Sequence, residues 1–315
     1  MLEKHISKII YMVLVLLCAS SSYGISVSDK TITDNSGRKI IVNFSFNRII
    51  SLYGAHTENL IFLGAKENII GVSKHDRLDP ASNKKKFSYR DGVEKFLAAK
   101  PDLVIIRPMI ERSYKRLIER LSKHTIVISL QPSSIDEMFV YWKALGLLTG
   151  KNKKSLSMVK NFKNAVKEFE SIGTHGKKVY FEAIHRKMKT FNKNSMAIYV
   201  LKKAGGINIA SDAKQVRKTN IASYGKERIL EKANDIDIYL AQKGVMNRTS
   251  ISIIREEPGF SLIKAVKRNR IYLVDEEIVS RPTMRLLSGI YKIGSYIYPD
   301  LFIKSGKKIL NKYMR

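Results

Sequence analysis

The chain has 315 residues, of which 57 are lysine or arginine and 28 aspartate or glutamate, giving a formal net charge of +29. The basic residues are scattered along most segments without zinc-finger spacing or aromatic-interleaved basic motifs, so we interpret them as a solvated surface rather than a nucleic-acid site. A single cysteine excludes a disulfide framework, so the fold must rest on its hydrophobic core.

Residues 1–24 have the features of a secretory signal peptide. Two lysines precede an apolar run over residues 9–17, and small residues follow it. The run is short for a membrane span, and no later segment reaches the roughly twenty apolar residues that a span needs. We therefore expect cleavage after Gly24 and export to the periplasm. Lipid attachment at Cys18 is the less favoured alternative, because Leu17 rather than a small residue precedes it.

Residues 25–133 are predicted to form an N-terminal α/β lobe. Alternating apolar residues on both sides of a turn signal at residues 34–37 predict a β-hairpin. Further along, buried strands alternate with helices: the strands are RIISL, NIIGV, DLVII and TIVISL, and the helices are GAHTENLIFLGA, VEKFLAAK and ERSYKRLIERLSKH. This alternation predicts a parallel, doubly wound sheet.

Residues 134–173 predict a long helix without an intervening strand, which Gly146 and Gly150 could divide. Residues 174–315 then repeat the alternation, with strands KKVYFEAI, DIDIYLAQ and IYLVD and a final apolar helix in PTMRLLSGIYKIGSYIY. The sequence therefore predicts two Rossmann-like α/β lobes joined by a single bridging helix.

Several phrases resemble one family when they are taken in order: R-I-I-S-L, A-x-K-P-D-L-V-I-I, K-A-G-G-I-N-I-A and I-Y-L-V-D. They are similar to periplasmic substrate-binding proteins of ABC importers for ferric siderophores, haem and cobalamin, over nearly the whole chain after residue 24. The resemblance implies that one long helix crosses the back of two lobes and that the lobes move little when ligand binds between them. It also implies the permease of an ABC importer as partner. We expect a monomer without an intrinsic cofactor.

The resemblance assigns permease docking to Glu94 in VEKFLAAKPDLV and Glu227 in KERILEKANDID. Each lies in the short helix before a buried strand, where family members carry a surface carboxylate that meets arginines of the permease. The alternative is an ordinary surface glutamate that a neighbouring lysine stabilises by about 0.2–0.5 kcal/mol.

Ligand-binding residues are expected in the loops after the C-terminal ends of strands, where ligands of open α/β sheets bind. Arginine supplies bidentate donors to carboxylate or catecholate oxygens, and aromatic rings pack on the apolar body of a ligand. Such loops suit a bulky anionic metal chelate. The candidate ligand-binding residues are Tyr53, His56, His75, Arg90, Arg107, His185, Lys189 and Arg281.

His56 and His185 are expected in the first strand-to-helix loop of their lobes, facing each other across the cleft. This pair permits direct capture of zinc or manganese by His56, His75 and His185 with Glu58 or Glu182. The cationic residues around His185 favour an anionic chelate instead. Glu182 and His185 lie three positions apart on a predicted strand, so we expect them to point to opposite sides.

Motifs for catalysis do not occur. The sequence has no G-x-S-x-G, H-E-x-x-H or Walker motif, and no cysteine after residue 24, so we do not expect an enzyme. We expect a periplasmic receptor that captures an iron chelate of the ferric-siderophore type and delivers it to an ABC importer. A cobalamin or haem receptor of the same family, or a receptor for free zinc or manganese, is the alternative.

Overall fold

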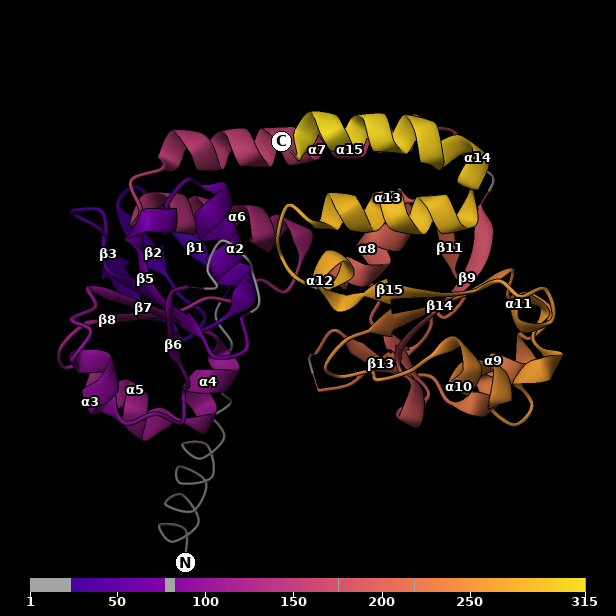
Figure 1. Ribbon diagram of the computed structural model, residues 1–315, viewed down its shortest axis with the longest axis horizontal. Helices are drawn as coiled ribbons and strands as arrows, with labels where there is room; N and C mark the ends of the chain where they lie inside the picture. The colour runs from indigo at the N-terminus through magenta and orange to yellow at the C-terminus, as the bar shows by residue number, and fades with distance from the viewer. Residues whose placement is uncertain (1–23, 77–82, 175, 218, 315) are drawn as a thin grey trace, which may run out of the picture.

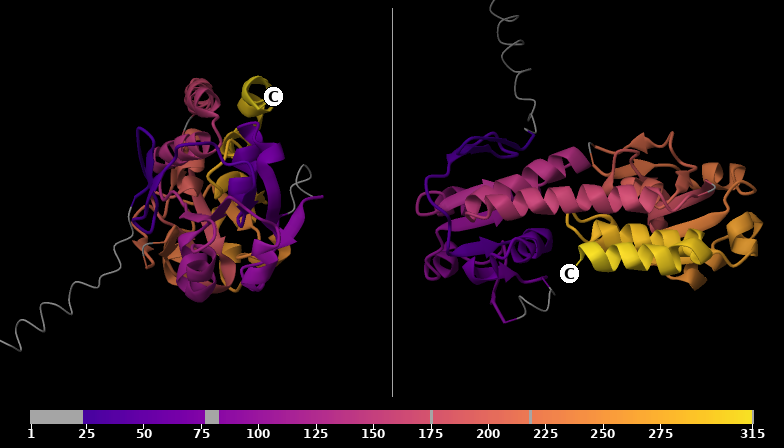
Figure 2. Two further views of the ribbon diagram at one scale, coloured as in Figure 1. Left: turned by 90° about the vertical axis from the view of Figure 1, so that its left-hand side faces the viewer. Right: turned by 90° about the horizontal axis from the view of Figure 1, so that it is seen from above.

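The computed structural model describes residues 24–76, 83–174, 176–217 and 219–314, so the predicted signal peptide and Cys18 lie outside the described residues. Two α/β lobes lie side by side, as predicted (Figure 1). Helices α7 (Asn152–Glu170) and α15 (Lys307–Tyr313) lie along one side of the molecule, which we call the back (Figures 1 and 2). Within the described ranges, no helix has the length and apolarity to cross a membrane.

The N-terminal lobe contains the predicted parallel sheet. Its strand order is β6 (Lys85–Phe87), β5 (Ile69–Ser73), β4 (Ile49–Ser51), β7 (Leu103–Ile106) and β8 (Ile126–Ser129). On one face, alternate strand residues pack with α2 (Gly54–Phe62) and α6 (Ile135–Leu148). The other face packs with α3 (Val93–Leu97), α4 (Pro108–Ser113) and α5 (Lys115–Leu121). Helices on both faces explain why β4 and β7 are buried throughout and are apolar apart from Ser51.

The predicted hairpin is present and is extended by one strand. β1 (Ser26–Ser28), β2 (Thr31–Thr33) and β3 (Lys39–Ile41) form an antiparallel sheet. In the turn before β3, the Asp34 carboxylate accepts hydrogen bonds from the backbone N–H groups of Ser36 and Arg38, both at 2.9 Å. Gly37 supplies the positive φ of 80° that this turn needs.

The C-terminal lobe has a mixed sheet, whereas a parallel one was predicted. The order is β12 (Lys214–Gln215), β13 (Ile221–Ser223), β10 (Lys189–Phe191), β9 (Lys177–Ile184), β14 (Ile238–Lys243) and β15 (Ile271–Asp275), and β11 (Gly206–Asn208) also pairs with β9. Strands β9, β11, β14 and β15 are parallel, but β10 returns antiparallel to β9 after a 3₁₀ turn, His185–Lys187. The chain therefore forms a hairpin where a strand-to-helix loop was expected.

Two groups of helices cover this sheet. One face packs with α8 (Met196–Lys203), α12 (Glu276–Val279) and α13 (Leu286–Ile297). The opposite face packs with α9 (Lys226–Glu231), α10 (Ile251–Glu256), the 3₁₀ turn Phe260–Leu262 and α11 (Lys264–Lys267). After α13 the chain continues through α14 (Pro299–Leu301) and a π-helical turn, Phe302–Gly306, into α15.

The segment between the lobes is two helices, α6 and α7, instead of the single helix predicted over residues 134–173. Ser134 caps α6 by accepting a hydrogen bond from the Glu137 N–H at 3.2 Å. The break follows Thr149, where Gly150 has a φ of 67° that a continuing helix cannot accommodate. Helix α6 packs in the N-terminal lobe, and α7 runs along the back of the molecule (Figure 2).

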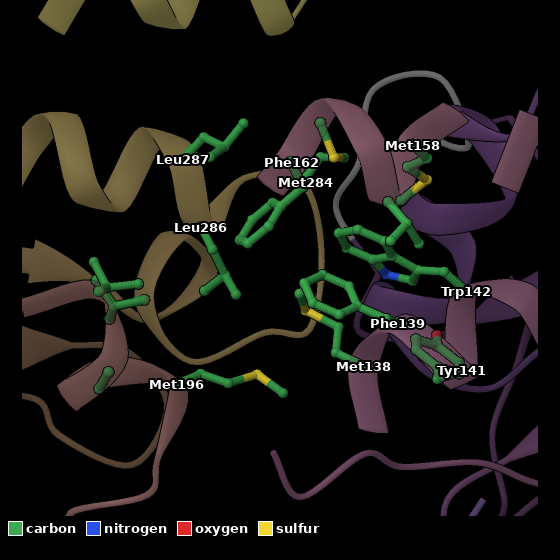
Figure 3. Packing of buried hydrophobic residues seen from close by; sticks show 14 of the residues in the cluster. Met138, Phe139, Tyr141, Trp142, Met158, Phe162, Met196, Met284, Leu286 and Leu287 are labelled. Atoms are coloured by element: carbon green, nitrogen blue, oxygen red, sulfur yellow. The ribbon is translucent and has the colours of Figure 1, made fainter. Parts of the chain in front are cut away.

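A shared hydrophobic core joins the lobes. Phe139 and Trp142 of α6 pack with Phe162 of α7 and with Met284 and Leu286 from the C-terminal lobe (Figure 3). The backbone carbonyl of Pro282 accepts hydrogen bonds from the Trp142 indole N–H at 3.1 Å and the Asn59 side chain at 2.9 Å. The segment before α13 is thereby fixed to the N-terminal lobe.

We expect Trp142→Phe to lower the free energy of unfolding by about 1–3 kcal/mol, because it removes one hydrogen bond to the Pro282 carbonyl and leaves a cavity. Urea unfolding at neutral pH measures the change. The matched control is Phe44→Leu, at an exposed aromatic residue, which should change stability by about 0.5 kcal/mol or less. Equal stabilities for wild type and Trp142→Phe would show that this bond does not join the lobes.

Candidate functional site

Three predicted ligand-binding residues, Tyr53, Arg107 and Arg281, meet where the lobes join. Tyr53 follows β4 and Arg107 follows β7, so the carboxyl ends of two neighbouring parallel strands place them side by side. The Arg107 guanidinium lies over the Tyr53 ring, 4.2 Å from its centroid. Arg281 comes from the other lobe, and its Nη1 lies 3.0 Å from where a Cβ on Gly54 would sit. We call these three residues the inter-lobe cluster.

Carboxylates surround the Arg281 side of the inter-lobe cluster. Arg281 pairs with Glu277 at 2.9 Å, and Glu277 also pairs with Arg285 at 2.9 Å. Arg285 lies 3.8 Å from Glu58, a nearly buried residue of α2. Burial raises the pKa of the Glu58 carboxyl, and the nearby cations Arg285 and Arg281 oppose the rise. Arg281 is thus held in position by its own lobe.

Arg107 is the less neutralised cation of the pair. Among the described residues no carboxylate pairs with it, and its buried Nε has no hydrogen-bond partner. Burial raises the pKa of the Tyr53 phenol, whereas Arg107 and Arg281 lower it. The cluster therefore combines a neutral aromatic ring with two guanidinium groups. Such an arrangement can bind an anion that carries an apolar or aromatic body.

His56 does not lie in the loop where it was predicted. It lies inside α2 and is fully buried. Its Nδ1 is 2.6 Å from the Tyr141 hydroxyl, and its Nε2 is 3.2 Å from the Ile106 carbonyl oxygen. Burial lowers the pKa of His56 to about 3, so the ring is neutral and both nitrogens are used within the core. Helix α2 begins at Gly54, as predicted for GAHTENLIFLGA, so His56 belongs to that helix and not to the loop before it.

The prediction that Glu182 and His185 point to opposite sides is wrong. The His185 Nδ1 lies 2.7 Å from the Glu182 carboxylate, because the strand ends at Ile184 and the 3₁₀ turn brings the ring back over it. Buried Glu182 also accepts hydrogen bonds from Tyr239 at 2.5 Å and Asn247 at 2.9 Å. The bond with Glu182 raises the pKa of His185.

His56 and His185 therefore belong to separate networks, with no hydrogen bond between them among the described residues. The predicted set of metal ligands is likewise not assembled. Within residues 24–76, 83–174, 176–217 and 219–314, no group of three or more His, Cys, Asp or Glu side chains is placed to hold a metal ion.

The remaining candidates are His75, Arg90 and Lys189. His75 is exposed in the turn after β5, and exposed Arg90 forms a hydrogen bond with Tyr114 that raises the pKa of the arginine. Lys189 lies half-buried in β10, opposite Ile184. In the part of the chain that the structure describes, none of the three forms a hydrogen bond or ion pair with the cluster.

Sequence reasoning missed Glu277 and Arg285, which hold Arg281 in place. The signal was present in the sequence, because Glu277, Arg281 and Arg285 are spaced four apart. That spacing lines up side chains on a helix. Pro282 lies in the break between α12 and α13, and Glu277 pairs with both arginines across this break.

Glu94 and Glu227 occupy matching places in the two lobes. Each is the second residue of a short helix, α3 or α9, and each helix follows a glycine, Gly92 or Gly225. Both glutamates are exposed. Arg120 lies 2.8 Å from Glu94, whereas Glu227 has no ion-pair partner among the described residues. Helices α3 and α9 lie on the side of the lobes away from α7 and α15 (Figure 1).

The fold and these placements agree with comparisons to known proteins. A family model described as "Periplasmic binding protein" matches residues 49–278. The chain belongs to the periplasmic binding protein family. The resemblance stated from the sequence is therefore confirmed, and the family is one of substrate-binding receptors.

Individual periplasmic binding proteins resemble the chain over most of its length. An uncharacterized ABC transporter substrate-binding lipoprotein of Bacillus subtilis, YvrC, is 27% identical over 283 residues, 86% of each chain. A possible iron-binding (periplasmic solute-binding) protein of Staphylococcus epidermidis is 30% identical, with a TM-score of 0.70 over 81% of this chain and 100% of that one. The haem-binding protein HutB of Vibrio cholerae, 17% identical, has the same fold with a TM-score of 0.69 over 81% of this chain and 100% of its own.

The buried, neutral His56 should make stability depend on pH. Its pKa falls from 6.5 to about 3 on folding, so the unfolded chain binds a proton that the folded chain does not. The contribution of neutral His56 to the free energy of unfolding is complete above pH 6.5. It is lost as the pH falls towards 3, at up to about 1.4 kcal/mol per pH unit. Urea unfolding across this range should show a shallower slope for His56→Gln than for wild type. The control is His124→Gln, at an exposed histidine. Identical slopes for wild type and His56→Gln would contradict the assignment.

Proposed function

We propose that this periplasmic binding protein is an exported receptor that captures an iron chelate of the ferric-siderophore type between its lobes and delivers it to the permease of an ABC importer. The observation that carries the proposal is that Arg107, over the Tyr53 ring, and Arg281, against Gly54, come from different lobes to neighbouring residues. The description of the S. epidermidis protein as possibly iron-binding supports the same ligand class.

The chemistry of the inter-lobe cluster favours a chelate over a free cation. Two guanidinium groups repel a bare divalent metal ion, whereas a ferric chelate presents anionic oxygens on its outer surface. The buried Arg107 Nε without a partner is a donor that such an oxygen could satisfy. Tyr53 offers a ring face to the organic part of the ligand.

Haem is the second candidate ligand. The V. cholerae protein of the same fold is described as haem-binding, and haem joins a flat aromatic body to two carboxylates. Arg107 and Arg281 could pair with those carboxylates, and the Tyr53 ring lies against the Arg107 guanidinium.

Export is part of the proposal. The B. subtilis relative is described as a lipoprotein, which supports lipid attachment at Cys18 as an alternative to release into the periplasm. Both routes place the receptor outside the cytoplasmic membrane, where an importer collects its substrate.

Replacing Arg107 or Arg281 by Ala should weaken chelate binding by about 10- to 100-fold each, because each loses a charge-assisted hydrogen bond in a partly buried site. Calorimetric titration with ferric siderophores, haem, cobalamin, zinc and manganese measures the affinities. Arg116→Ala, at an exposed arginine of α5, is the matched control. Binding of free zinc or manganese alone, or chelate affinities unaltered in both variants, would contradict the proposal.

Charge reversal of both Glu94 and Glu227 to Arg should abolish uptake in cells while chelate affinity stays unchanged, because these residues lie on α3 and α9 and not in the inter-lobe cluster. Transport of radioactive iron, with titration of the purified variant, separates the two effects. The double variant Glu67→Arg/Glu170→Arg reverses two exposed glutamates outside α3 and α9 as control. Normal uptake by the Glu94/Glu227 variant would refute docking through these residues, without bearing on the ligand.

A further inference from the structure

Lysines scattered in the sequence gather on the back of the molecule. In α7, Lys153, Lys160, Lys163 and Lys167 are all exposed. Their spacing of seven, three and four places them in one stripe along the helix, opposite its buried residues such as Phe162 and Phe169.

A second set of lysines continues this surface. Helix α15 lies on the same side of the molecule as α7 in both views (Figure 2). Lys312 of α15 pairs with Glu168 of α7 at 2.7 Å, and Tyr313 donates a hydrogen bond to the same carboxylate at 2.6 Å. Around α15 and the turn before it lies an open hollow of about 680 Å³, lined by Ile303, Lys304, Lys307, Lys308, Asn311 and Lys312. We call the α7 stripe and this hollow the basic back face.

The charge of the basic back face is largely uncompensated. On α7, Glu168 pairs with Lys312, and Glu170 pairs with Lys203. Among the described residues, the four lysines of the stripe form no ion pair with a carboxylate, and neither do Lys304, Lys307 and Lys308 of the hollow. A second hollow, of about 560 Å³, is lined by Lys163, Lys167, Lys193 and Lys202 together with Asp136.

Exposed apolar side chains lie among these lysines. Leu156 belongs to the α7 stripe and is 55% exposed, and Ile303 lines the α15 hollow and is 56% exposed. Lysines around exposed aliphatic side chains fit a lipid surface, where the cations meet anionic headgroups and the apolar groups enter the boundary of the acyl chains. A soluble polyanion would use the lysines alone.

We propose that the basic back face binds the surface of an anionic phospholipid bilayer. Helices α3 and α9, with Glu94 and Glu227, lie on the opposite side of the lobes (Figure 1). A molecule bound to a membrane through its back thus presents both glutamates away from that membrane. Membrane binding through the back and docking through α3 and α9 on the same membrane exclude each other. The proposal does not depend on the identity of the ligand.

Co-sedimentation with vesicles tests the proposal. Wild type should bind vesicles that contain phosphatidylglycerol, bind phosphatidylcholine vesicles much more weakly, and dissociate as salt is raised. Lys153→Glu/Lys160→Glu/Lys167→Glu should bind phosphatidylglycerol vesicles at least about tenfold more weakly. The control Lys123→Glu/Lys214→Glu/Lys267→Glu changes the net charge equally at exposed positions elsewhere and should lose much less. Equal losses in the two triple variants would overturn the proposal by showing that only net charge matters.

A second variant separates lipid from polymer. Leu156→Ser/Ile303→Ser should weaken vesicle binding while binding to heparin, a soluble polyanion, stays unchanged. Val245→Ser/Leu262→Ser, two other exposed apolar residues, is its control. Wild-type binding to heparin but not to phosphatidylglycerol vesicles would overturn the proposal and assign the face to an anionic polymer. Unchanged vesicle binding by Leu156→Ser/Ile303→Ser would overturn it as well.

Discussion

The carbonyl of Pro282 is the point on which the arrangement of the two lobes depends. It accepts hydrogen bonds from Asn59 of α2 and Trp142 of α6, so a segment of the C-terminal lobe is fixed to two helices of the N-terminal lobe. Arg281 directly precedes Pro282, and Arg285 follows within the same segment. The bonds that join the lobes therefore also place the second guanidinium group of the inter-lobe cluster against Gly54. A shift of this segment would move Arg281 away from Gly54.

The surroundings of His56 and His185 shift the pKa values of the two rings in opposite directions. His56 is enclosed by Tyr141 and a backbone carbonyl, so the charged ring finds no compensating anion and its pKa falls. His185 has a carboxylate at Nδ1 and Glu257 3.6 Å from Nε2, so its charged form is favoured and its pKa rises. The stability that His185 contributes is present below its unfolded pKa and is lost as the pH rises through the folded value, opposite to His56.

Sequence patterns predicted the features that depend on near neighbours in the chain. Apolar runs indicated β4, β5, β7 and β8, the turn signal at residues 34–37 indicated the hairpin, and strand ends indicated Tyr53 and Arg107. The errors have tertiary causes. Strand β10 is three residues long, and its pairing with β13, about thirty residues away, is invisible to local periodicity. His56 lies in the first turn of the helix predicted from Gly54, and its assignment to the preceding loop overlooked that this turn faces the core.

The net charge can be counted from the sequence, but only the fold shows that many of the lysines lie on one side of the molecule. Contiguous runs of lysine are short, so the linear pattern indicated a generally solvated surface. In a helix with 3.6 residues per turn, Lys153, Lys160, Lys163 and Lys167 lie along one side. Helix α15 lies on the same side of the molecule and adds further lysines. Two lobes then separate this cationic side from the side that carries Glu94 and Glu227. The basic back face and the proposed docking residues therefore cannot meet the same flat membrane at once.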